Sequence, residues 1–370
     1  MHFLHNWRCA GTTVNSIFSS NYHEHYLKIG HPFSVFGWPH DYNNHPSPLL
    51  SVGHIRNLVN SNYPKSVIIG GHTFLGLESF LPGSFDIWMN YRDPLQRLNS
   101  GILRFYKRQF VSEPGRSDLM DVSQSLASTD LDFPDFVDRL LSSTLKRESN
   151  GIARRLSALS LSNNIQINSD TNVETVDFLL SNYTEKQLFD SALSNLQTIK
   201  LLINSSHIQA SLICIERFYQ LASPLINPFS NLAHNPVTLS GAKSNDQSVI
   251  NNCNNILTNH SRVDLKLLPY LHSMFAQQVN DSNITERDIM VRDAIHQERL
   301  FLPKWFVMEK FSRDDVIRLV SDSLEKRCRQ FQSLENDILR TVLSWDGLTI
   351  DFRQDVNGYM VNQYSRPSFV

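Results

Sequence analysis

The chain has 370 residues, enough for one large α/β domain with a smaller appendage. Its hydrophobic content of 41% is typical of a globular protein, and its formal net charge of −2 excludes a global field that would recruit nucleic acid. No apolar run approaches the length of a membrane span, and no signal peptide is evident. Four widely spaced cysteines form no CxxC pair and are expected to be free thiols in a reducing compartment, which favours a cytoplasmic protein. These are Cys9, Cys214, Cys253 and Cys328.

Short, nearly continuous apolar runs alternate with helical patterns along the first two thirds of the chain. Strands of this kind are typical of a parallel sheet that helices cover on both faces, because both sides of each strand are then buried. The sequence therefore predicts an α/β fold. The expected strands are Met1–His5, Ser66–Gly70, Phe85–Tyr91, Thr198–Ile203 and Ser211–Ile215.

The connections between these strands differ in character. Residues His31–Pro48 are rich in Pro, His, Asn and aromatic side chains and are expected to form a surface loop. The pattern over Asp130–Leu141, with Pro134 near its start, predicts a helix. Residues Asn235–Asn254 are polar and irregular, which predicts a long loop over the face that holds the active site, followed by a helix over Arg262–Val279.

The pattern changes after about Asp281, so we expect one domain over residues 1–280 and a mainly helical C-terminal extension over residues 281–370. Ser312 is suited to cap a long amphipathic helix, and apolar residues recur over Ile317–Val342 at spacings near three and four. Such a stripe is a candidate helical hairpin or homodimer seam. The tail Leu348–Val370 alternates like a strand or an extended arm.

The stretch Phe3–Thr13 combines an apolar strand, a short polar turn and the start of a helical pattern. Free backbone N–H groups and the positive end of a helix dipole then point at one spot, which makes an anion site. Arg8 adds a positive charge, and Thr12 and Thr13 add hydroxyl donors. The Gly-Lys-Ser/Thr of kinase-type phosphate loops is missing.

A second informative stretch covers Ile87–Ser100. A strand ends with Arg92 at its carboxyl tip, and Asp93 and Pro94 are suited to begin a helix as its cap and first residue. Ser100 lies about two turns into that helix, so Arg92 and Ser100 are expected to reach the same anion.

Together these stretches resemble the sulfotransferases that use PAPS (3′-phosphoadenosine 5′-phosphosulfate), whose patterns are H-x-P-K-T-A-G-T-T and R-D-P-x-x-R-L-x-S. The resemblance implies that the first loop holds the 5′-phosphosulfate and that Arg92 and Ser100 hold the 3′-phosphate. Arg97 also fits the second pattern and is expected to be structural. The implied nucleotide contacts are Arg8, Cys9, Ala10, Gly11, Thr12, Thr13, Arg92 and Ser100.

Residues Gly70–Pro82 lie between the two stretches and follow an apolar strand. They resemble the G-H-x-x-x-G-L-x-x-x-L-P segment of carbohydrate sulfotransferases related to the heparan sulfate 2-O and 6-O enzymes. That resemblance makes His72 the general base, a role that suits imidazole because its ordinary pKa lies near working pH. The strand's carboxyl end is also where ligands of open α/β sheets collect.

Weaker similarity to the same enzymes continues downstream, in the right order, to about residue 280. It covers Asn150–Leu156, Ile215–Leu221 and Asn259–Tyr270. Within the first of these, one of Arg154 and Arg155 is a candidate to face the active site while the other faces solvent.

The resemblance implies a P-loop-like three-layer fold and transfer of a sulfuryl group from PAPS to a hydroxyl of a carbohydrate, with a tyrosine or a small metabolite as alternative hydroxyl acceptors. His72 takes the acceptor proton, and Arg8 neutralises charge on the bridging oxygen and the leaving phosphate. Neither a metal nor nucleic acid nor a membrane span is implied. The related enzymes also imply the Golgi lumen if an N-terminal anchor precedes Met1.

Two residues depart from the family pattern, since Arg8 stands where the relatives have Lys and Trp7 stands where they have Pro. An arginine offers a permanent charge and a planar fork that fits an oxyanion, but it is bulkier than lysine and cannot act as a proton donor. A catalytically silent nucleotide- or glycan-binding relative is therefore an alternative hypothesis. A P-loop kinase is another, which the missing Gly-Lys-Ser/Thr disfavours.

Overall fold

A computed structural model provides the structure of the chain. The residues that it describes are 1–6, 8–10, 14, 26–29, 35–36, 51–62, 68–71, 73–110, 133–143, 145–163, 167–171, 173–220, 247–297, 334, 336–337, 350–354 and 360–364. They divide into two compact units. The first comprises Met1–Gly11, Leu27–Ser205 and Ala233–Met274, and the second comprises Thr12–Tyr26, Ser206–Leu232 and Phe275–Val370. The predicted boundary near residue 280 stays a prediction.

The centre of the first unit is a sheet with four parallel strands in the order β4-β1-β5-β6. These are β1 (His2–Leu4), β4 (Ile68–Gly71), β5 (Ile87–Tyr91) and β6 (Leu201–Asn204). All of their residues are buried, as expected for strands that are covered on both faces. The prediction of an α/β fold with a parallel sheet is therefore confirmed, as are four of the five predicted strands.

Two further strands extend the sheet beyond β4. They are β2 (Tyr26–Ile29) and β3 (Val35–Phe36), which pair with each other in antiparallel fashion. The second of these falls inside the predicted surface loop His31–Pro48, the rest of which lies outside the described residues.

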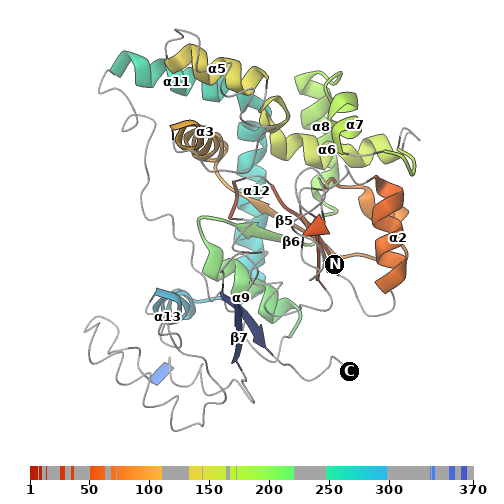
Figure 1. The fold of residues 1–370 in the computed structure, drawn as a ribbon. Coiled ribbons are helices and arrows are strands. Elements are labelled where there is room, and N and C mark those ends of the chain that lie inside the picture. The colour runs from red at the N-terminus through yellow and green to blue at the C-terminus, as the bar shows by residue number, and fades with distance from the viewer. Residues whose placement is uncertain are drawn as a thin grey trace. The chain divides into compact units, whose positions relative to one another are not determined.

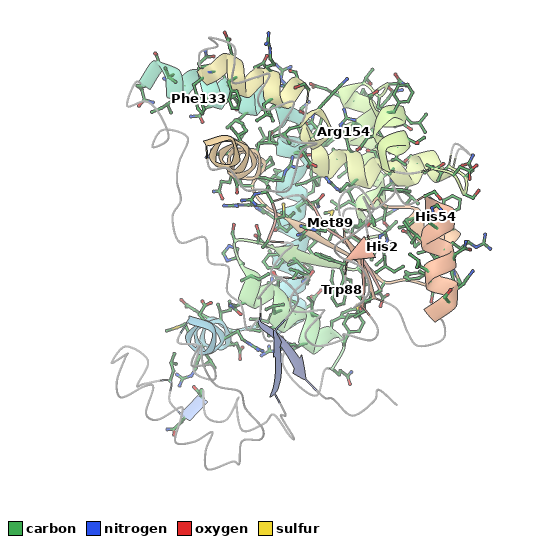
Figure 2. The ribbon with its side chains drawn as sticks, in the orientation of Figure 1. His2, His54, Trp88, Met89, Phe133 and Arg154 are labelled. Carbon is green, nitrogen blue, oxygen red and sulfur yellow. The ribbon has the colours of Figure 1, made fainter. Side chains whose placement is uncertain are left out.

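Helix α3 (Pro94–Phe110) follows β5 directly and begins as predicted. The Asp93 carboxylate accepts a hydrogen bond from the Gln96 backbone N–H at 2.9 Å, and Pro94 is the first helical residue. An apolar cluster that includes Leu98 and Ile102 packs α3 against α5 (Phe133–Ser142) and α11 (Gln247–His260), the three helices grouped in Figure 1. Phe133, labelled at the start of α5 in Figure 2, packs against the same cluster.

The remaining helices of the first unit include a second group, in which α6 contacts both α7 and α8 (Figure 1). The elements not yet bounded are α2 (Val52–Asn62), η2 (Leu77–Phe80), η3 (Lys146–Glu148), α6 (Gly151–Asn163), α7 (Val173–Leu180) and α8 (Glu185–Leu196). Helix α12 (Arg262–Asp281) begins in this unit and continues into the second, which confirms the predicted helix over Arg262–Val279.

Two sequence predictions are wrong. The run Ser211–Ile215, predicted as a strand, lies within helix α9 (Ile208–Phe218). Every residue from Gln209 to Ile215 is buried, so the apolar side chains cover all sides of this helix and leave no helical period to read. The predicted loop Asn235–Asn254 is helical from Gln247 onward, because α11 contributes Cys253 and Leu257 to the apolar cluster on α3.

The second unit contains α9, α13 (Glu286–Gln297) and a hairpin of β7 (Ile350–Gln354) and β8 (Met360–Tyr364). Both described segments of the tail are strands, as its alternating pattern predicts. Arginines tie α9 to α13 through the ion pairs Arg217–Asp288 and Arg292–Glu216. Most of the predicted amphipathic helix over 317–342 lies outside the described residues.

Candidate functional site

The turn after β1 is clamped onto β5 by two buried asparagines. The backbone N–H of Asn6 donates to the Asn90 side-chain oxygen at 2.6 Å, and the Asn6 amide donates to the Asn90 carbonyl at 2.5 Å. The Asn90 amide in turn donates to the carbonyl of Cys9 at 2.5 Å. Sequence reasoning missed Asn90, although a polar residue inside the apolar strand Ile87–Tyr91 is a signal that something must bind it.

The clamped turn adopts an uncommon backbone conformation. Arg8 has φ 60° and Ala10 has φ 57°, both in the left-handed region. Each such residue costs roughly 1–2 kcal/mol when it is not glycine. Strain of this kind is retained where surrounding contacts over-determine the backbone, and it concentrates at functional sites. The asparagine clamp supplies those contacts here.

Arg8 and Ser100 meet although 92 positions separate them in the chain. The guanidinium of Arg8 donates to the Ser100 hydroxyl oxygen from Nε at 3.0 Å and from Nη2 at 2.7 Å. Both side chains are half-buried. The fold therefore brings together one residue from each of the two stretches that the sequence assigned to a single nucleotide.

Arg92 lies where the sequence predicts, directly after β5 at its carboxyl end. Its Nε donates to the Gln96 side-chain oxygen at 3.4 Å, so within the described residues its side chain bonds to the first turn of α3 rather than to Ser100. Its charge nevertheless reaches the turn after β1, because Arg92, Arg97 and Arg155 all favour the ionised form of the Cys9 thiol. Glu148, which pairs with Arg97 and Arg155, opposes this effect on the thiol.

Cys9 itself is an unreactive thiol. Burial raises its pKa to about 12, despite the opposing influence of the three arginines. The side chain is fully buried and stays protonated at neutral pH, so it is not a nucleophile. Cys9 contributes to the site through its backbone, because the Asn90 amide binds the Cys9 carbonyl and holds it in place.

Five residues of the predicted site region lie outside the described residues: Trp7, Gly11, Thr12, Thr13 and His72. The neighbours of His72 are described. The Gly71 carbonyl at the end of β4 accepts hydrogen bonds from the backbone N–H of His5 at 2.8 Å and from that of Thr73 at 2.9 Å. The chain is therefore anchored on both sides of the predicted base.

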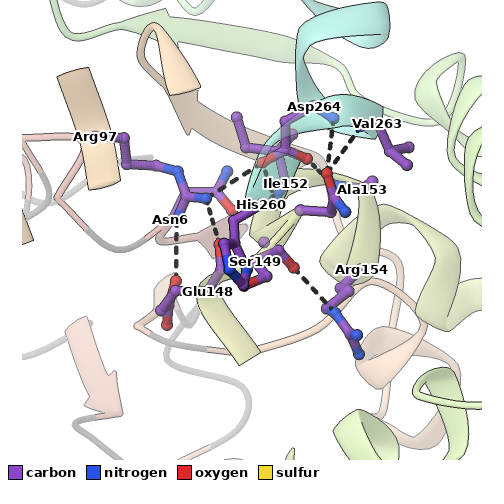
Figure 3. A network of polar contacts seen from close by, with 12 residues as sticks. Asn6, Arg97, Glu148, Ser149, Ile152, Ala153, Arg154, His260, Val263 and Asp264 are labelled. Atoms are coloured by element: carbon purple, nitrogen blue, oxygen red, sulfur yellow. Dashed lines mark hydrogen bonds and ion pairs between the residues drawn. The ribbon is translucent and has the colours of Figure 1, made fainter. Parts of the chain in front are cut away.

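A buried ion network surrounds Arg97 of α3 (Figure 3). The Arg97 guanidinium is fully buried and donates to the Glu148 carboxylate at 3.0 Å, to the Glu148 carbonyl at 2.6 Å and to the Asp264 carboxylate at 3.2 Å. Arg155 adds a contact to Glu148 at 3.3 Å. Arg97 is thus structural, as the sequence predicts, and Glu148 is a partner that sequence reasoning missed.

Two of the segments with weaker similarity, Asn150–Leu156 and Asn259–Tyr270, contribute residues to the same network. Asp264 accepts hydrogen bonds from the backbone N–H groups of Ile152 at 3.2 Å and Ala153 at 2.8 Å, which caps α6. Burial raises the pKa of the Asp264 carboxyl, and Arg97 and these two N–H groups oppose that effect. Asn150 accepts from the backbone N–H of Val263 at 2.8 Å. These polar residues hold α6 to α12.

Arg154 and Arg155 both bind within the protein. Arg154 donates to the Ser149 carbonyl at 3.1 Å, and Arg155 donates to the Gly151 carbonyl at 3.1 Å in addition to its contact with Glu148. Neither side chain points plainly into solvent, so the described contacts assign both arginines to the scaffold around α6 (Figure 2 labels Arg154).

No protein-family model matches the chain, and no curated protein matches it either. Among the described residues, no group of three or more His, Cys, Asp or Glu side chains is arranged to hold a metal ion. The same residues include no helix that is both long and apolar enough to cross a membrane.

Proposed function

We propose that this chain is a sulfotransferase of P-loop-like fold that moves a sulfuryl group from PAPS to a hydroxyl of a carbohydrate. The observation that supports this most is the contact between Arg8 and Ser100, which joins the two predicted anion-binding stretches. The contact lies beside the carboxyl ends of β1 and β5, the edge where open α/β sheets bind their ligands.

The charges around the turn suit a nucleotide with phosphates at both ends. Arg8 is permanently charged, and Ser100 is a neutral hydroxyl that accepts its hydrogen bonds, so a guanidinium and a hydroxyl lie together at this turn. In the proposed complex the Arg8 fork binds the bridging oxygen and the 5′-phosphate, while Ser100 and Arg92 bind the 3′-phosphate. The strained backbone at Arg8 and Ala10 is already formed, so the backbone of these two residues needs little reorganisation on binding.

The reaction is an in-line displacement at sulfur. The acceptor oxygen forms a bond to sulfur as the bond from sulfur to the bridging phosphate oxygen breaks, and the acceptor proton passes to His72. The leaving group is 3′-phosphoadenosine 5′-phosphate, whose added negative charge Arg8 stabilises. The protein otherwise contributes position, which by itself supplies a large share of the rate of such transfers.

A transfer assay with labelled PAPS and a panel of glycans tests this proposal. We expect transfer by the wild-type chain, a loss of about 100-fold or more in Arg8→Ala through the missing charge, and retained transfer in Arg8→Lys. His72→Ala should lose about 100-fold through the missing base. Arg56→Ala removes an exposed arginine of α2 and is the matched control, which should transfer like wild type. Unchanged turnover in His72→Ala contradicts its assignment as base.

A catalytically silent relative is the second candidate, and the arginine at position 8 favours it because the related enzymes have lysine there. Tight binding of 3′-phosphoadenosine 5′-phosphate with no transfer to any acceptor would support it over the enzyme. Competition of ATP with PAPS would instead favour the kinase hypothesis.

A further inference from the structure

His2 is a buried polar residue in the middle of the parallel sheet. It lies in β1, between β4 and β5, and its side chain is fully buried. Both ring nitrogens have partners: Nδ1 lies 3.0 Å from the Glu78 carboxylate, and Nε2 lies 2.7 Å from the Thr73 hydroxyl. An imidazole in such surroundings is tolerated because both of its polar atoms are satisfied.

The Glu78 carboxylate determines which atom donates in its hydrogen bond with His2. Burial raises the pKa of its carboxyl, but the hydrogen bond from His2 and the backbone N–H donors outweigh burial, so the net shift is downward and the group is ionised at neutral pH. A carboxylate only accepts, so Nδ1 of His2 carries a proton. The other ring nitrogen, Nε2, pairs with the Thr73 hydroxyl.

The carboxylate of Glu78 also binds the backbone. Both of its oxygens accept from the Gly76 N–H, at 2.9 Å and 3.1 Å. Gly76 has φ 103°, a conformation that disfavours any residue with a Cβ, which explains the glycine of the G-H-x-x-x-G pattern. Leu75 and Leu77 on either side are fully buried. The segment after β4 is therefore held in two ways. Leu75 and Leu77 are buried, and hydrogen bonds connect Gly76 through the Glu78 carboxylate to His2.

We propose that His2 and Glu78 are positioning residues, which hold Thr73, the described neighbour of the predicted base His72, against the N-terminal segment that leads to Arg8. Residue 72 is flanked by Gly71, which accepts from the N–H of His5, and by Thr73, which binds the side chain of His2. Both anchors belong to the N-terminal segment that continues directly into Arg8. This inference rests on the proposed function, in which a base and a cation must act on the two ends of one displacement.

Thr73, His2 and Glu78 place a hydroxyl, an imidazole and a carboxylate in the same order as the catalytic triads of hydrolases. Thr73 is 1% exposed and His2 is fully buried, so a substrate carbonyl has no access to this hydroxyl. A triad nucleophile must meet its substrate, whereas a positioning hydroxyl gains from exclusion of water. Burial thus favours positioning over nucleophilic catalysis.

Three variants test the inference: Thr73→Val removes the hydroxyl with little change of shape, Thr73→Ser restores it, and Glu78→Gln removes the charge. We expect Thr73→Val and Glu78→Gln to lower kcat for transfer from PAPS by about 10- to 100-fold, because a base displaced by a fraction of an ångström reacts poorly. The Kd for 3′-phosphoadenosine 5′-phosphate should change by less than about 2-fold, since Arg8, Arg92 and Ser100 are untouched. Thr73→Ser should return kcat to near the wild-type value.

Amide hydrogen exchange supplies a readout that needs no catalysis. Exchange at Thr73 and Gly76 should accelerate in Thr73→Val and Glu78→Gln, while exchange in α8 stays unchanged. Wild-type kcat in both variants, or a fall in nucleotide affinity that parallels the fall in kcat, overturns the inference. If the wild-type chain itself transfers nothing, the proposed function fails and the base assignment with it. Active wild type with insensitive variants contradicts the positioning role alone.

Discussion

Helix α3 presents two polar side chains, three positions apart, to contrasting surroundings. Arg97 is fully buried and donates to carboxylates of η3 and α12, so its charge is neutralised inside the protein. Ser100 is half-buried and accepts hydrogen bonds from the guanidinium of Arg8. The comparison separates scaffold from candidate site: the buried Arg97 and its counter-ions hold helices together, whereas the half-buried pair of Arg8 and Ser100 joins the two stretches of the candidate site.

Loss of the Arg97 cation should give the largest change in stability. We expect Arg97→Met to reduce the free energy of unfolding by about 3–5 kcal/mol, because Asp264 then loses its buried cation and Glu148 keeps only its contact with Arg155. Urea denaturation measures this change. Lys186→Met is the control, since its pair with Asp190 is exposed and should contribute almost nothing. A change below about 1 kcal/mol in Arg97→Met would mean that the network is not the scaffold we infer.

The fall of stability at alkaline pH should next show whether the fold encloses the Cys9 thiol in the turn of the candidate site. Burial raises the pKa of Cys9 to about 12, whereas an unfolded cysteine ionises near 8.5. The unfolded chain therefore releases this proton first, and stability that is fully present below about pH 8 falls as pH rises, by about 2 kcal/mol at pH 10. Cys9→Ala should flatten this part of the pH profile. Equal slopes in both proteins would show that the Cys9 thiol is not enclosed.

Gly151 tests how tightly the buried network is packed. A Cβ at this position would lie 3.0 Å from Nη1 of Arg97 and 3.1 Å from the Glu148 carboxylate. Gly151→Ala should cost about 1–2 kcal/mol through this crowding, offset in part by the better helix propensity of alanine. The same substitution in an Arg97→Met background should cost less, because one of the crowded groups has gone. Strictly additive losses in urea denaturation would contradict the crowding.

Ser100→Ala should have the smallest effect on stability and a clear effect on binding. The hydroxyl is half-exposed, so the free energy of unfolding should change by less than about 1 kcal/mol. The Kd for 3′-phosphoadenosine 5′-phosphate should rise about 10-fold or more, because a hydrogen bond to a phosphate is lost. Calorimetric titration measures both Ser100→Ala and the control Ser61→Ala, an exposed serine of α2 that should change neither quantity. A Kd that Ser100→Ala leaves unchanged removes Ser100 from the nucleotide site.

Several elements could be predicted from local sequence because their signals are local. The four parallel strands are short apolar runs, and Asp93 with Pro94 starts a helix through contacts within one turn. The run Ser211–Ile215 could not be assigned in this way, since a helix buried on all sides and a buried strand have the same apolar composition. The helical start at Gln247 depends on the apolar cluster that α11 joins, which lies far away in sequence.

The residues of the candidate site also divide into those that the sequence could suggest and those that it could not. Arg8, Arg92 and Ser100 were identifiable from their patterns in sequence, and so was a structural role for Arg97. The hydrogen bonds of Asn90 to the turn, and of His2 to Thr73 and Glu78, were not, because a lone polar residue in an apolar strand does not name its partner.

Sequence alone determined the α/β class, the start of α3 and the residue types available for binding an anion, because strand burial, helix capping and side-chain charge are properties of neighbouring residues. Tertiary structure alone decided that Arg8 meets Ser100, that Arg97 meets Glu148 and Asp264, and that His2 holds Thr73 and Glu78. Each of these contacts joins positions dozens of residues apart, and only the packing of strands and helices selects such pairs from the many that a sequence permits.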